Sequence, residues 1–267
     1  MYEFDRATPV TVSLRLQRGT ADLVAEERPT VQVELAAEAG GEAPEGFTVA
    51  LEGDTLVVHA PEATWHWRRT PKVHVLIRVP LDSALAAKST AADIRASGRW
   101  STGQADMASA DVHMEEVTGD AYLKAASGDV IVNRVGGSLR IGSSSGDLRV
   151  GDVMGDVKAD TASGEIVIGR VGGSLQAASA SGDVEVGVVS RGTARLSTAS
   201  GDVSVGVAAG TGVWLDLNTA SGSTSSDLSM SGAAPVAGQA ATLELRVRTA
   251  SGDITVHRAL GDLRAAA

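Results

Sequence analysis

Short turns made of serine, glycine and an acidic residue are the most regular source of reactive side chains in this sequence. SASGDVEV at 179–186 and TASGDITV at 249–256 are two examples. Serine can act as a nucleophile, and carboxylates can act as a base or hold a cation. The same residue types also build tight turns, because glycine adopts a positive φ and the polar side chains bond to nearby backbone groups.

The acidic residues of these turns recur at steps of 18 or 19 residues. If each repeat forms one coil, they stack in a single column with neighbours about 4.8 Å apart. Like charges at that distance in water cost about 1 kcal/mol per pair, so backbone N–H donors, serine hydroxyls or cations must relieve the repulsion. This acidic corner column consists of Asp93, Asp111, Asp129, Asp147, Glu165, Asp183 and Asp202.

We expect a structural role for this column, with cation binding as the alternative. Calcium-binding rolls use Gly-Gly-x-Gly-x-Asp turns, in which closely spaced carbonyls and aspartates surround the ion. Here a single glycine is followed directly by the acidic residue. The sequence therefore predicts no tight metal site and no cofactor. No arrangement of Ser, His and Asp stands apart from the repeat, so we expect no enzymatic activity.

A second candidate site is the segment TWHWRRTPK at 64–72, which holds two of the four tryptophans. Aromatic and basic side chains on one exposed loop are typical of contacts with a protein, a glycan or a lipid headgroup. A hairpin tip folded back over its own domain would explain the same composition. The possible partner-binding residues are Trp65, His66, Trp67, Arg68 and Arg69.

The elements that carry these turns are predicted to be short strands. Glycines of a second bend lie nine residues before the corner glycines, so each 18-residue coil has two halves, and each half alternates apolar and polar residues. This pattern predicts an all-β fold, a parallel β-solenoid with about 18 residues per coil. Two of the inward ladders begin Val112, Val130, Leu148, Ile166 and Leu139, Val157, Leu175, Ala194.

Competing all-β folds fit the spacing less well, because a sandwich has no in-register 18-residue repeat and a propeller blade needs about 40 residues. The outward residues have mixed charge, which describes a soluble surface; examples are Arg140, Arg149, Lys158, Gln176, Glu185 and Arg195.

The domain organisation follows from where the repeat begins. Residues 1–85 alternate as strands without the turn motif and are expected to form irregular coils or an antiparallel cap. Residues 86–267 form the regular solenoid, with an extruded loop at about 222–241 that is rich in Ser, Gly and Ala. The last repeat, which ends in VHRALGDLRAAA, is expected to be the uncapped end of the stack.

Composition limits the possible partners. The formal net charge is −10, which disfavours nucleic acid and anionic membranes, and the absence of cysteine excludes disulfides and thiolate metal sites. Aromatic residues are only 3% of the chain, so Val, Leu, Ile and Ala must form the core. We find no signal-like segment and no membrane span, and we expect a cytoplasmic protein.

The motifs TASGD[VI]xV, GDTLVVHAP and VHVLIRVPLDSAL resemble a bacterial family of β-strand repeats of unknown function that is labelled "putative adhesin". The resemblance extends from about residue 8 to the end of the chain. It implies a β-solenoid fold and envelope or surface roles, and it implies no catalytic residues.

Three functions remain open at this point. The first is a non-enzymatic scaffold, a rigid solenoid that presents its surfaces to a protein partner or to a second copy of itself. The second is a carbohydrate-binding, adhesin-like solenoid. The third is a module that assembles when cations bind its acidic corners.

Overall fold

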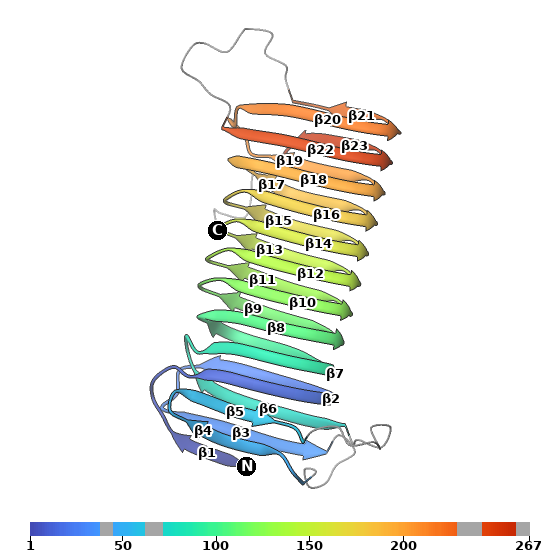
Figure 1. Cartoon of the computed structure of the whole chain (residues 1–267). Coiled ribbons are helices and arrows are strands. Elements are labelled where there is room, and N and C mark those ends of the chain that lie inside the picture. The colour runs from blue at the N-terminus through green and yellow to red at the C-terminus, as the bar shows by residue number, and fades with distance from the viewer. Residues whose placement is uncertain (38–44, 62–71, 229–241, 260–267) are drawn as a thin grey trace.

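The computed structural model describes residues 1–37, 45–61, 72–228 and 242–259. These residues form 23 strands and no helix, joined in one long hydrogen-bonded stack (Figure 1). Strands of successive repeats are parallel and in register, so that Leu139 lies beside Val157 and Val157 beside Leu175. The predicted all-β parallel solenoid is confirmed.

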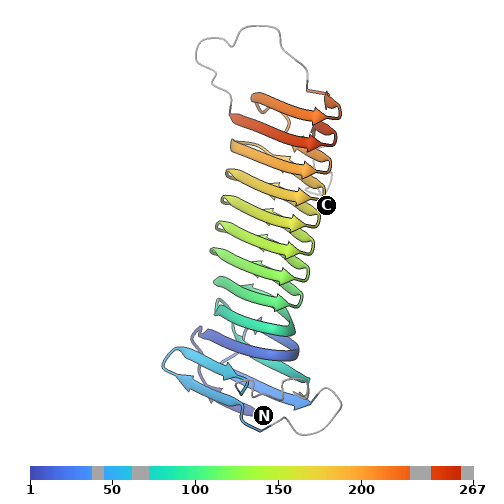
Figure 2. The same ribbon diagram turned by 45° about the vertical axis from the view of Figure 1, so that its right-hand side comes forward.

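Each regular coil gives one strand to each of two layers (Figures 1 and 2). The outward surface of the first layer is called face A. In axial order its strands are β8 (Thr102–Ser109), β10 (Ala121–Ser127), β12 (Leu139–Ser145), β14 (Val157–Ser163), β16 (Leu175–Ser181), β18 (Gly192–Ser200), β22 (Leu243–Ser251) and β20 (Val213–Ser221).

The outward surface of the second layer is called face B. Its strands, in the same axial order, are β9 (Val112–Val117), β11 (Val130–Val135), β13 (Leu148–Val153), β15 (Ile166–Val171), β17 (Val184–Val189), β19 (Val203–Val207), β23 (Ile254–Arg258) and β21 (Thr224–Ser226).

The core lies between the two layers and is built from the predicted ladders. Alternate residues of every regular strand point inward, and Leu148, Ile166 and Val186 are each 0% exposed. Burial of an aliphatic side chain of this size contributes about 1.5–3 kcal/mol to stability. Because each coil buries its side chains against the coils above and below, the stack is one continuous aliphatic core.

The Ser-Gly corners require glycine for two reasons. Gly164 and Gly182 have φ values of +147° and +142°, a left-handed conformation that other residues rarely adopt. A Cβ atom on Gly182 would also lie 2.1 Å from the carbonyl oxygen of Gly164 in the preceding coil. Close stacking therefore requires glycine at the corners from Gly128 to Gly252, whereas the first two corners have Ala92 and Ala110 at this position.

The N-terminal part combines one full coil with antiparallel strands. β2 (Thr11–Glu26) pairs in parallel along nearly its whole length with β7 (Ala84–Trp100), and each of these two strands runs through both layers. The remaining strands of this region are β1 (Tyr2–Asp5), β3 (Thr30–Ala37), β4 (Thr48–Glu52), β5 (Thr55–His59) and β6 (Val73–Pro80). On the side away from β7, β2 pairs in parallel with β5 and β6.

Antiparallel pairs join β1 to β3, β3 to β6, and β4 to β5, so residues 1–85 contain both a regular coil and an antiparallel end.

The C-terminal end has an inverted coil order. The coil of β22 and β23 inserts between the coil of β18 and β19 and the coil of β20 and β21, which precedes it in the chain (Figure 1). The prediction that the last repeat ends the stack is therefore wrong: Ile254 and Val256 are 0% exposed. Most of the expected loop at 222–241 lies outside the described residues, although Thr224–Ser226 form β21.

Among the described residues, no helix has the length and apolar character needed to cross a membrane.

Candidate functional site

The carboxylates of the acidic corner column bind backbone groups of the neighbouring coil. Asp129 Oδ1 accepts a hydrogen bond from the Asp147 N–H at 2.9 Å, and Asp147 Oδ1 accepts one from the Glu165 N–H at 3.0 Å. Beyond the regular repeats, Asp202 Oδ1 accepts from the Asp253 N–H at 2.8 Å. Bonds to ionised acceptors are stronger than neutral ones, so each such carboxylate ties one corner to the next.

The structure extends this column by one member, from Asp202 to Asp253. Asp253 Oδ1 accepts bonds from the backbone N–H of Ser223 at 2.7 Å and from its hydroxyl at 3.0 Å. The backbone bond and then the hydroxyl bond from Ser223 hold the pKa of Asp253 below its usual value, because both stabilise the charged form. The outermost coil has Ser223 where other coils have an acid, and this contact adds to the strand pairing that joins it to the next coil.

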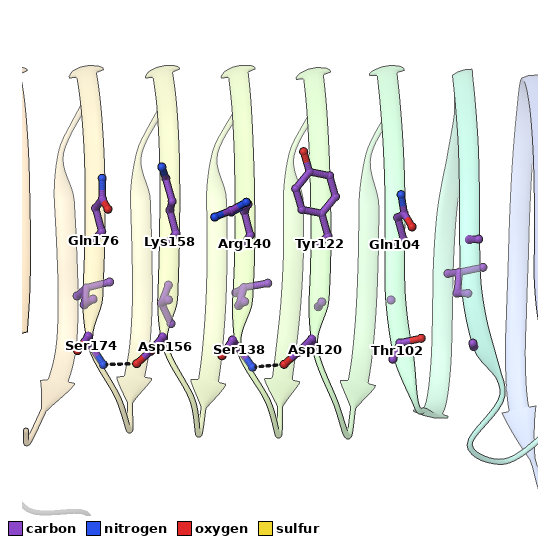
Figure 3. Close-up of a pocket in the computed structure, with 18 of the residues that line it drawn as sticks. Thr102, Gln104, Asp120, Tyr122, Ser138, Arg140, Asp156, Lys158, Ser174 and Gln176 are labelled. Carbon is purple, nitrogen blue, oxygen red and sulfur yellow. Dashed lines mark hydrogen bonds between the residues drawn. The ribbon is translucent and has the colours of Figure 1, made fainter. Parts of the chain in front are cut away.

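The second bend repeats the same device in alternate coils. Asp120 Oδ1 accepts from the Ser138 N–H, and Asp156 Oδ1 from the Ser174 N–H, both at 2.7 Å (Figure 3). These serines and aspartates alternate along one edge of face A.

Metal binding finds no support in this geometry. In the parts of the chain that the structure describes, no three His, Asp or Glu side chains come together in a way that could hold a metal ion. The predicted partner-binding loop is outside the described residues, since Trp65, His66, Trp67, Arg68 and Arg69 all fall within 62–71.

Face A carries a column of cationic and polar side chains that runs along the solenoid axis. Each member comes directly after an inward ladder residue such as Leu139 or Val157, and the strand register places the members side by side. Figure 3 shows five of them, from Gln104 to Gln176. This cationic column consists of Gln104, Tyr122, Arg140, Lys158, Gln176, Arg195 and Arg246, and it ends at Asp216 in the outermost coil.

Two pairs of like charges are direct cross-strand neighbours in this column. Arg140 lies opposite Lys158, and Arg195 lies opposite Arg246. Like charges in this position destabilise a sheet. Neither Arg140 nor Arg195 has an ion pair or hydrogen bond to a side chain within the described ranges. In a chain with a net charge of −10, this arrangement is the opposite of what sheet stability would select.

The two other cations of the column have local partners. Lys158 Nζ lies 3.6 Å from Asp160 Oδ2, and Arg246 Nε donates to Glu244 Oε1 at 2.7 Å. The Arg246 guanidinium also lies 5.3 Å from the centre of the Trp214 ring, whose side chain is 47% exposed.

A groove with a volume of about 800 Å³ follows this column along the axis. One side is formed by the cationic column, including Tyr122, which is 42% exposed. The other side is formed by the bend residues with hydroxyl and carboxylate groups, including Asp120, Ser138 and Asp156 (Figure 3). The groove crosses coils from β7 to β18, so an elongated ligand could lie in it parallel to the axis.

The other edge of face A is flat, because its outward positions are small. These exposed residues lie next to the acidic corners, and apart from one serine all are alanine. This small-residue column consists of Ala108, Ala126, Ser144, Ala162, Ala180, Ala199, Ala250 and Ala220.

The sequence reading missed the cationic column because it pooled the outward residues of both layers. Arg149 and Glu185 belong to face B, whereas Arg140, Lys158 and Arg195 belong to face A. A signal was present: the face A cations all stand one residue after the ladder of Leu139, Val157 and Ala194. Arg246 could be added only with the inverted coil order.

Together, the stacked corners, the two strand layers and the in-register surface columns define a β-solenoid repeat protein. The family model described as Toastrack DUF4097 matches residues 12–257. The chain therefore belongs to the Toastrack DUF4097 family, and the resemblance expected from the turn motifs is confirmed.

The solved structures that are similar to this chain share little sequence with it. One is "putative lipid binding protein" from Parabacteroides distasonis, with 14% identity, a TM-score of 0.53, and coverage of 96% of this chain and 95% of that chain. Another is "a putative adhesin" from Bacteroides fragilis, with 11% identity, a TM-score of 0.47, and the same coverage of 96% and 95%. No curated protein matches the chain.

Proposed function

We propose that this protein is a non-enzymatic scaffold that binds a partner macromolecule through face A. The observation that carries the proposal is the pair of like-charge neighbours, Arg140 beside Lys158 and Arg195 beside Arg246, in a strongly acidic chain. Natural sequences break local stability rules mainly where function requires it. An anionic surface placed over the column would turn a repulsive arrangement into a favourable one.

The solenoid is suited to this role because its surface groups are fixed relative to one another. Each outward side chain stands on a strand that is hydrogen-bonded on both sides and rests on a buried ladder. A preorganised surface loses little conformational entropy when it binds. The corner carboxylates, which could have acted as bases, instead accept backbone N–H bonds, so their arrangement supports binding and gives no support to catalysis.

A photo-cross-linking amino acid tests which face is used. We would place it at Gln104 or Gln176 on face A and, as matched controls, at Val167 or Thr255 on face B, all in full-length chain expressed in its host. The proposal predicts adducts from the face A positions and few from face B. Equal adducts from both faces, or none from face A, would contradict it.

A further inference from the structure

We infer that the partner on face A is a second copy of this chain, packed face to face about a two-fold axis parallel to the solenoid axis. The inference rests on the proposed function and names the molecule that occupies the surface. Four observations carry it: the charge pattern, the ability of a corner carboxylate to bind a guanidinium while it keeps its backbone bond, the small-residue column, and the size of the face.

The charge pattern is self-complementary under this symmetry. The cationic column follows the start of each face A strand, and the acidic corner column follows its end. A two-fold axis parallel to the stack reverses the strand direction but keeps the height of each coil. It therefore places the cationic column of one copy over the acidic corner column of the other, twice. The facing pairs are Arg140 with Asp147, Lys158 with Glu165, Arg195 with Asp202, and Arg246 with Asp253.

The spacing of these pairs matches without adjustment. Both columns have one member per coil, and the coil height of about 4.8 Å is set by the same inter-strand hydrogen bonds. A polymer of another kind would match that spacing only by coincidence. A second copy has the same coil height and therefore the same spacing. The like-charge pairs of one copy then face a matching row of carboxylates.

The acidic corner column can bind a guanidinium without losing its structural bonds. Arg149 of face B shows this within the chain, because its Nη2 lies 2.9 Å from Asp147 Oδ2 while Asp147 Oδ1 accepts the Glu165 N–H. Asp202 likewise uses Oδ1 for the Asp253 N–H and has no ion pair to any described residue. At Asp202 the second oxygen is therefore available to a cation from outside, whereas at Asp147 it already contacts Arg149 of face B.

The small-residue column lies close to the proposed axis and faces its own copy across it. Alanine side chains such as Ala162 and Ala180 let two sheets approach closely and supply an apolar centre between the charged flanks. At the flanks, the corner ridge of one copy lies over the groove beside the cationic column of the other.

The face is also large enough. A seven-residue strand such as β12 and six coil steps from Gln104 to Arg246 give about 23 Å by 29 Å, or about 1,300 Å² over both copies. Specific interfaces need about 1,000 Å² or more.

Sedimentation velocity of the full chain over a range of concentrations tests this inference. We expect a species of twice the 27.1 kDa chain mass, weakened as the ionic strength rises from about 0.05 M to about 0.5 M. The cation variant, Arg140→Gln, Lys158→Gln and Arg195→Gln, should raise the dimer Kd by tenfold or more. The acid variant, Glu165→Gln, Asp202→Asn and Asp253→Asn, should raise the Kd similarly, because it removes the charges that face the cations. At Asp202 and Asp253 the new amide oxygen still accepts the corner N–H, so the fold is kept.

The matched control removes three paired cations outside face A: Arg78→Gln, Arg95→Gln and Arg134→Gln. This variant should dimerise like the parent chain. Mixing the cation and acid variants restores one complete flank, so the mixture should associate more tightly than either variant alone. Far-UV circular dichroism of each variant should match the parent, which separates loss of contact from loss of fold.

A chain that stays monomeric at all concentrations would overturn the inference, as would dimers that the face A variants do not weaken. If a monomer instead binds a uronic-acid polymer such as polygalacturonate, and the cation variant abolishes that binding, the second copy is the wrong partner but the proposed function stands. If neither association occurs and face A gives no cross-links, both fail.

Discussion

The middle of this solenoid and its two ends follow different rules of assembly. From β8 to β19 the coils stack in the order of the chain, each beside the coil that precedes it by 18 or 19 residues. At both ends a coil is inserted out of order: β2 lies between β7 and the later strands β5 and β6, and β22 lies between β18 and the earlier strand β20.

Burial explains which coil is outermost. In β23 the inward residues are Ile254 and Val256, both 0% exposed, whereas the residues of β21 in the same register are Thr224 and Ser226, both exposed. A coil with apolar inward residues on both strands gains most when it has neighbours on both sides. The comparison teaches that the repeat fixes the shape of a coil, and inward polarity decides its place in the stack.

The cationic column depends on this inversion. If the coils had stacked in chain order, Arg195 would lie beside Asp216, and the column would stop there; in the observed order it lies beside Arg246. The architecture of the C-terminal end thus lengthens the surface that we assign to binding.

The largest expected effect comes from disrupting a stacked corner in the middle of the solenoid. In Gly182→Ala the new Cβ would meet the Gly164 carbonyl oxygen, and we expect a loss of more than about 4 kcal/mol in the free energy of unfolding. Gly210→Ala is the control, because Gly210 also has a positive φ, +77°, but nothing lies within 4 Å of its Cβ position. It should lose only about 1 kcal/mol. Urea denaturation measures both, and equal losses would refute close stacking of the corners.

A second pair of variants compares an inserted coil with the outermost one. Leu245 is 0% exposed, and Leu245→Ala should cost about 3 kcal/mol through lost burial and a cavity. Leu215, at the equivalent position of the outermost coil, is only partly buried, and Leu215→Ala should cost about half as much. Thermal unfolding gives the comparison, and a larger loss for Leu215 would place the coils in the opposite order.

The corner carboxylates should matter less than the glycines. In the parent chain the Asp202 N–H donates to Asp183 Oδ1 at 2.8 Å. Asp183→Ala removes this acceptor and should lower the free energy of unfolding by about 1–2 kcal/mol. Asp183→Asn keeps an acceptor oxygen and should cost less. If Asn and Ala are equally destabilising, the charge of the carboxylate matters and its hydrogen bond does not.

The smallest expected effect concerns pH. Hydrogen bonds from Ser223 lower the pKa of Asp253, and a side-chain bond from Arg99 lowers the pKa of Asp82. A group whose pKa is lowered by folding contributes stability above its unfolded pKa and loses it as pH falls through the folded pKa. The melting temperature should therefore fall below about pH 4, and less steeply in Asp253→Asn; identical slopes would contradict the assignment.

Much of the fold could be predicted from the sequence because the regular coils repeat the same local physics. The 18-residue spacing predicts the positions of inward residues such as Leu148 and Ile166 and of corner glycines such as Gly182. The end order could not be read from spacing, since the step from Ser221 to Ser251 fits either stacking. Thr224 and Ser226 were the available signal: polar residues at ladder positions mark a coil with only one neighbour.

The candidate site was harder to predict because a column forms only when register and coil order are known. Arg140 and Lys158 are 18 residues apart in the sequence and adjacent in space. Arg195 and Arg246 are also adjacent in space, but in the sequence the whole coil of β20 and β21 lies between them. The loop with Trp65 and Trp67 falls outside the described residues and stays a prediction.

Disulfide trapping tests the stacking order most directly, since the chain has no cysteine of its own. Ser204 lies directly beside Thr255, so Ser204→Cys with Thr255→Cys should form a disulfide under mild oxidation. Ser204→Cys with Ser225→Cys should not, because those residues are two coils apart, about 9.6 Å. Non-reducing peptide mapping decides the matter, and a bond in the second pair but not the first would show that the coils stack in chain order and that the cationic column is shorter than described.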